Sequence, residues 1–84
     1  MSKLYVTTSA NLAAARAAAG DADMFACLAS ATGTEPATHH LAYGIVPDEV
    51  EAAIAPYCAI YDGTVEDGLQ ASGLKRILPT TPPL

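Results

Sequence analysis

Residues 21–32 read Asp-Ala-Asp-Met-Phe-Ala-Cys-Leu-Ala-Ser-Ala-Thr, and the conformation of this stretch decides the fold. Met24, Cys27 and Leu28 fit the apolar stripe of a helix. The stretch is followed by the turn-forming run Gly-Thr-Glu-Pro at 33–36, which equally suits a buried strand that enters a hairpin. We favour the strand and keep the helix as the alternative.

The chain before this stretch predicts a strand followed by a helix. Residues 3–7 alternate apolar and polar side chains, as in a half-buried strand. Thr8 or Ser9 then offers a cap to an alanine-rich helix over 10–19, and Gly20 is the natural end of that helix.

The chain after this stretch predicts a strand over 38–46 with one face of large side chains, made of His39, Leu41, Tyr43 and Ile45. Pro47 ends this strand and begins a helix with acidic residues in its first turn. Pro56 makes the helix end near Ala55, because a residue before proline avoids the helical conformation.

Three shorter elements are predicted toward the C-terminus. Residues 57–61 form a strand, and residues 74–78 form an edge strand. Between them, the segment from Thr64 to Asp67 resembles a capping box and predicts a helix over 65–71.

With a strand in 21–32, the element order is β-α-β-β-α-β with a short C-terminal helix and strand appended. This order predicts an α+β fold of the small ferredoxin-like, split β-α-β kind, in one domain over 1–78. With a helix there, an N-terminal helical hairpin packs on a smaller sheet. Residues 79–84 are expected to form a flexible, proline-rich tail. The expected core residues are Leu4, Val6, Leu12, Leu28, Leu41, Tyr43, Ile45, Val50, Ile54 and Ile60.

Charge is segregated along the chain of 84 residues, whose net charge is −5. All nine carboxylates lie between positions 21 and 67, whereas no Lys or Arg occurs between 17 and 74. Such a chain repels phosphate, so we expect no direct binding of nucleic acid. No stretch approaches the about 18 apolar residues of a membrane span, and we expect a cytoplasmic protein.

No residue pattern in the sequence indicates catalysis or a bound cofactor. His39 and His40 are adjacent, and adjacent strand residues point to opposite faces, so they cannot readily share one metal ion. Cys27 and Cys58 lie in apolar stretches without a nearby cation, which predicts two buried, reduced, unreactive thiols. We therefore predict no cofactor, no metal and no enzymatic activity; an enzyme with a site between subunits is an alternative without positive evidence.

The acidic residues indicate an interaction protein. We expect a small accessory protein that binds another protein, one with a basic surface, through a mixed acidic and apolar face. The alternative is an inhibitor of the kind made by phages or mobile elements, which mimics nucleic acid and blocks a basic groove. The alanine-rich core buries little area per residue, which also suggests a homodimer.

The acids at the start of the helix predicted after Pro47 locate the expected binding face. Asp48, Glu49 and Glu51 lie in its first turn, where one or two acids already satisfy the helix dipole. The third acid exceeds this need, since no Lys or Arg lies near it in sequence. We predict that these residues bind the partner, together with Asp62 if the fold brings it near.

Overall fold

The computed structural model describes residues 2–77 and contains a five-stranded antiparallel sheet. Strand β1 pairs with β4 on one side and with β3 on the other, and β2 and β5 follow beyond β3. The order is therefore β4-β1-β3-β2-β5, with bounds Lys3–Thr8 for β1, Cys27–Ser30 for β2, His39–Gly44 for β3, Cys58–Asp62 for β4 and Lys75–Arg76 for β5.

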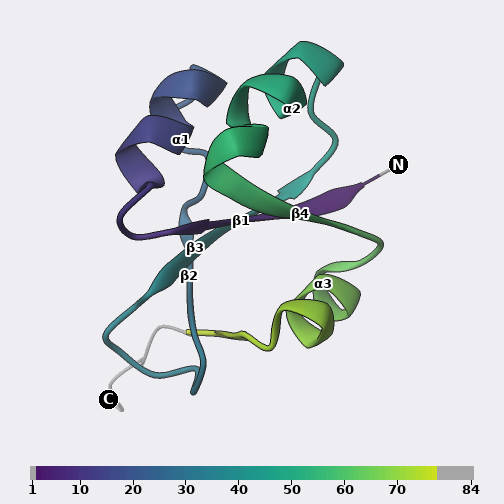
Figure 1. Cartoon of the computed structure of the whole chain (residues 1–84). Coiled ribbons are helices and arrows are strands. Elements are labelled where there is room, and N and C mark those ends of the chain that lie inside the picture. Colours follow the sequence, from purple (N-terminus) through teal and green to yellow (C-terminus); the bar gives the residue numbers. More distant parts are fainter. Residues whose placement is uncertain (1, 78–84) are drawn as a thin grey trace, which may run out of the picture.

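Helices cover both faces of the sheet (Figure 1). Helices α1 (Leu12–Ala19) and α2 (Asp48–Ile54) lie together on one face, and α3 (Val65–Ser72) lies on the other. A 3-10 turn, η1 (Ala55–Tyr57), links α2 to β4. None of the helices within residues 2–77 has the length and apolarity needed to cross a membrane.

The decisive stretch forms turns and then a strand. Residues 22–25 are turns, and Cys27–Ser30 form β2. The hydroxyl of Ser30 closes the following loop, because it accepts from the backbone N–H groups of Gly33 and Thr34 and donates to the carbonyl of Thr34. The strand prediction is confirmed over these four residues, and the alternative of an N-terminal helical hairpin is wrong.

The other predicted elements form with shifted ends. Helix α1 begins two residues later than predicted, because Thr8 accepts from the N–H of Asn11 in the connecting turn. Helix α2 gives way to the 3-10 turn at Ala55, next to the proline. Helix α3 begins with the capping box predicted from Thr64 and Asp67. The predicted tail at 79–84 lies outside the described residues.

The core has two halves, one on each face of the sheet. Leu4, Val6, Ala29 and Leu41 are buried on the face of α3, with Tyr61, Val65, Leu69 and Leu74 packed against them. Tyr5, Ala15, Phe25 and Ile54 are buried on the face of α1 and α2. Alternate residues of β1 therefore serve opposite core halves, as the side-chain period of a strand requires.

Two residues of the predicted core are exposed. Tyr43 retains 47% of its accessible surface and Ile45 retains 74%. Tyr43 follows the predicted alternation, but α3 packs mainly on β4 and β1, so this end of β3 stays partly uncovered. Of the other predicted core residues, Leu4, Val6, Leu41 and Ile54 are buried, and Leu12, Leu28, Val50 and Ile60 are half-buried.

Candidate interaction surface

One of the predicted binding acids, Glu51, has internal partners. Its carboxylate accepts two hydrogen bonds from the Lys3 ammonium, at 3.0 and 3.1 Å, and one from the Tyr5 hydroxyl at 2.8 Å. These contacts attach α2 to β1 across 46 and 48 residues of sequence. Glu51 thus stabilises the fold, a role that the sequence did not reveal because Lys3 is distant along the chain.

The same lysine brings Asp62 to this site. Lys3 and Asp62 are register partners in the β1–β4 pair, and the ammonium lies 3.9 Å from the Asp62 carboxylate. The hydrogen bond to Glu51 is the largest cause that raises the pKa of Lys3, and the bond from Lys3 is the largest cause that lowers the pKa of Glu51. Burial, followed by the bond to Glu51, raises the pKa of Tyr5 to about 12.

Asp48 and Glu49 complete the acidic face. Both are exposed in the first turn of α2, and the charge of Asp48 also acts on Lys3. The charges of three carboxylates therefore act on Lys3, which forms salt bridges with two of them, Glu51 and Asp62. We call Asp48, Glu49 and Asp62 the acidic face.

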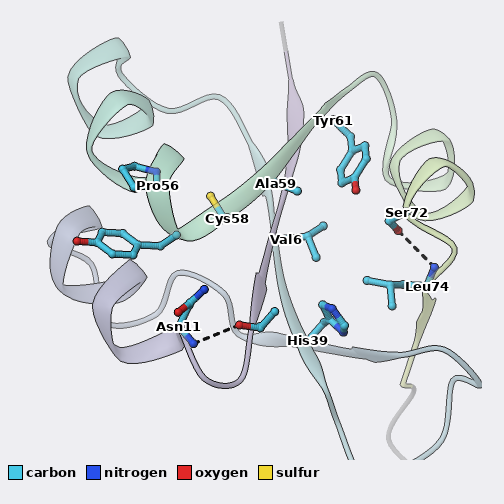
Figure 2. A pocket seen from close by; sticks show the side chains of 11 residues that line it. Val6, Asn11, His39, Pro56, Cys58, Ala59, Tyr61, Ser72 and Leu74 are labelled. Atoms are coloured by element: carbon cyan, nitrogen blue, oxygen red, sulfur yellow. Dashed lines mark hydrogen bonds between the residues drawn. The ribbon is translucent and has the colours of Figure 1, made fainter.

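An open groove runs beside β4, the strand that carries Asp62 at its end (Figure 2). It encloses about 330 Å³. On the side of α3 the labelled side chains are Val6, His39, Ala59, Tyr61, Ser72 and Leu74, and on the other side of the strand are Asn11, Pro56 and Cys58. The groove thus offers mainly apolar and hydroxyl-bearing side chains on both sides of one strand.

The cysteines differ in environment, and the expectation that both are buried is wrong for Cys27. Cys27 is exposed at the first position of β2. Cys58 is half-buried and donates to the carbonyl of Ile54 at 3.2 Å. Burial is the main cause that raises the pKa of Cys58 to about 11, which keeps this thiol protonated at neutral pH.

The histidines lie on opposite faces of β3, as the alternation predicts. His39 pairs in register with Thr8 and lines the groove, whereas His40 lies opposite Thr7. Burial, followed by the charge of Arg16, lowers the pKa of His40. Within residues 2–77 no three His, Cys, Asp or Glu side chains are grouped as a metal site would require.

Comparison with known proteins adds no relative. No protein-family model, no curated protein and no solved structure matches the chain. The acidic face and the groove are therefore the features of the fold that bear on function.

Proposed function

We propose that the protein is a small, non-enzymatic accessory protein that binds a protein partner with a basic surface. The observation that carries the proposal is the acidic face: Asp48 and Asp62 are exposed near a lysine that Glu51 already neutralises, and Glu49 is exposed beside Asp48 in the first turn of α2. The groove with its apolar and hydroxyl-bearing side chains lies along β4, the strand that ends at Asp62. A partner surface with lysines or arginines around an apolar centre has the complementary chemistry.

The use of acidic residues within the fold favours this proposal over the alternative of a nucleic-acid mimic. Glu51 is bound to Lys3 and Tyr5, and Asp67 caps α3, so these two of the nine carboxylates are occupied within the fold. A mimic requires a regular, dense array of outward charges, since duplex DNA carries one charge per about 1.7 Å of its axis.

We also propose that the six elements from β1 to β4 form a ferredoxin-like split β-α-β arrangement. The strand order β4-β1-β3-β2, the antiparallel pairing of each neighbour and the helices after β1 and β3 support this assignment. Helix α3 and strand β5 are then the C-terminal appendage.

The proposed function is tested with two variants of equal net charge. The acidic-face variant combines Asp48→Asn, Glu49→Gln and Asp62→Asn. The control variant combines Asp21→Asn, Asp23→Asn and Glu35→Gln. The chain, immobilised, is exposed to a lysate of its source organism, and bound protein is identified at low and high salt. We expect that the control variant still binds the partner and that the acidic-face variant does not. High salt should release the partner from the unmodified chain.

The variants exclude Glu51, because its loss would disturb the fold itself. Retention of the same partner by both variants, or retention that does not depend on salt, would contradict the proposal and place the interface elsewhere.

A further inference from the structure

The two edges of the sheet differ in how they are protected. Edge strands of soluble proteins are usually short, or carry lysine, proline or a bulge that prevents another strand from pairing. Strand β5 has only Lys75 and Arg76, so it is both short and basic. Strand β4 has five residues, Cys-Ala-Ile-Tyr-Asp, in unbroken register with β1 and without lysine or proline. Asp62 is its one charged residue.

The hydrogen bonds of β1 show which of its residues bond to β4. The Ser9 N–H donates to the Thr38 carbonyl at 3.1 Å, which continues the register of the β1–β3 pair by one residue. Successive residues of a strand direct their backbone groups to opposite neighbours. The odd-numbered residues of β1 therefore bond to β3, and Leu4 and Val6 bond to β4.

The outward groups of β4 follow from this alternation. Tyr61 and Ala59, the register partners of Leu4 and Val6, direct their N–H and C=O groups to β1. The outer edge therefore carries the backbone groups of Cys58, Ile60 and Asp62. Within residues 2–77, no backbone hydrogen bond from a turn, loop or cap reaches these three residues.

The groove lies inward of this edge, between β4, β1 and the end of α3. An extended segment paired with the outer edge of β4 would place alternate side chains beside Tyr61 on the face of α3 and beside Ile60 on the face of α1 and α2. Near the end of β4 the segment would meet Asp62, whose side chain is 75% exposed. Unpaired backbone groups and a negative charge thus coincide along one edge.

We propose that the outer edge of β4 binds an extended segment of the partner, with alternating apolar and basic residues, as an added strand. Main-chain hydrogen bonds supply affinity in this mode, and the exposed side chains of β4 and the acidic face select the side chains of the segment. This inference rests on the proposed function and specifies the chemistry of the partner.

A basic segment of another protein fits this edge better than the β4 edge of a second copy. Each copy carries a net charge of −5 and presents Asp62 with the acidic face at this edge, so two such edges repel each other. A lysine or arginine near Asp62 removes that repulsion and adds an attraction that salt weakens.

The test uses a short, end-capped synthetic peptide of alternating lysine and valine. The control peptide has the same charge but carries N-methyl groups on all internal amides, which prevents strand pairing. Binding to the full chain is measured by fluorescence anisotropy, and backbone amide exchange is followed by NMR. Asp62→Asn and Asp23→Asn are the matched protein variants.

The expected result is a dissociation constant about tenfold or more weaker for the N-methylated peptide, since several main-chain bonds are lost. The unmodified peptide should slow exchange of the Cys58, Ile60 and Asp62 amides, while Ala59 and Tyr61, which already bond to β1, should not change. Asp62→Asn should weaken binding, and Asp23→Asn should not.

Three results would overturn the inference. Equal binding of both peptides without altered exchange means that the acidic face attracts cations but the edge stays unpaired, which leaves the proposed function intact. No binding of either peptide rejects the edge as a site for such segments, while the retention experiment decides the proposed function separately. If a higher protein concentration without peptide already slows exchange of the Cys58, Ile60 and Asp62 amides, the edge pairs with a second copy of the chain.

Discussion

At the scale of single residues, the contact between Tyr5 and Glu51 links the core to the acidic face. Tyr5 is 1% exposed and extends its hydroxyl to a carboxylate on α2. A buried hydroxyl requires a hydrogen-bond partner, and Glu51 supplies one while also neutralising Lys3. The sequence suggests that Glu51 is a surplus charge, whereas in the fold its carboxylate binds Lys3 and Tyr5.

The first prediction concerns the ionisation of Tyr5. Its folded-state pKa of about 12 exceeds the ordinary value of 10.0, so between these values the unfolded chain loses a proton that the folded chain keeps. The contribution of Tyr5 to stability is therefore complete below pH 10 and is lost as the pH rises through about 12. A rapid pH-jump titration of tyrosinate absorbance should show one late phase near pH 12.

Tyr5→Phe should remove this late phase, and the matched variant Tyr43→Phe, at an exposed position, should retain it. A late phase that persists in Tyr5→Phe would show that another tyrosine is the protected one.

At the scale of elements, α3 packs closely on β1 because a glycine faces the strand. Gly68 is buried in α3, and a Cβ atom there would lie 2.8 Å from the Cβ of Leu4. Such a contact cannot be relieved by the far end of a side chain alone, so the helix would have to move away. The glycine thus sets the distance between the third helix and the sheet.

The second prediction is that Gly68→Ala destabilises the protein. Alanine normally stabilises a helix interior by roughly 0.5–1 kcal/mol relative to glycine. Here overpacking against Leu4 should outweigh that gain and lower the free energy of unfolding by about 1–3 kcal/mol. Urea denaturation gives the value.

The matched experiment repeats Gly68→Ala in a Leu4→Ala background, where the cost should shrink because the opposing side chain is gone. A more stable Gly68→Ala protein would mean that α3 lies farther from β1.

At the scale of the whole molecule, apolar surface remains uncovered on β2 and β3, at the end of the sheet where Gly44 pairs with Lys3. Tyr43 and Ile45 are exposed, and Cys27 is exposed on the neighbouring strand. The radius of gyration is 12.7 Å, and a chain of this size buries only about 60–65% of its unfolded surface. We therefore propose that two copies of the chain associate through this apolar surface.

The third prediction is a homodimer that forms through this uncovered surface at micromolar concentration. Sedimentation equilibrium should detect it, and Ile45→Lys should shift the equilibrium to monomer, because a charge replaces an apolar contact. The unfolding free energy of monomeric Ile45→Lys should stay close to that of the monomeric wild type, since the side chain is 74% exposed. A wild-type protein that remains monomeric at high concentration would contradict the dimer.

Local signals in the sequence determined the elements. The helix ends at Gly20 and Gly73 are left-handed, as glycine after a helix predicts, and the capping box at Thr64 forms. The alternation of β3 also follows from neighbouring residues. These features depend on backbone preferences and short hydrogen bonds within a few positions, so adjacent residues suffice to predict them.

Tertiary structure alone decided which side chains are covered and which charges meet. Phe25 is buried in a turn at the unusual φ of 66°, and Ile45 is exposed although it continues an apolar pattern. Glu51 pairs with Lys3 across 48 residues, so the surplus acid has a partner that no local pattern indicates. The position of β4 at a sheet edge is equally non-local. Burial, ion pairing and strand order depend on which distant segments pack together, which a periodic pattern within one segment does not specify.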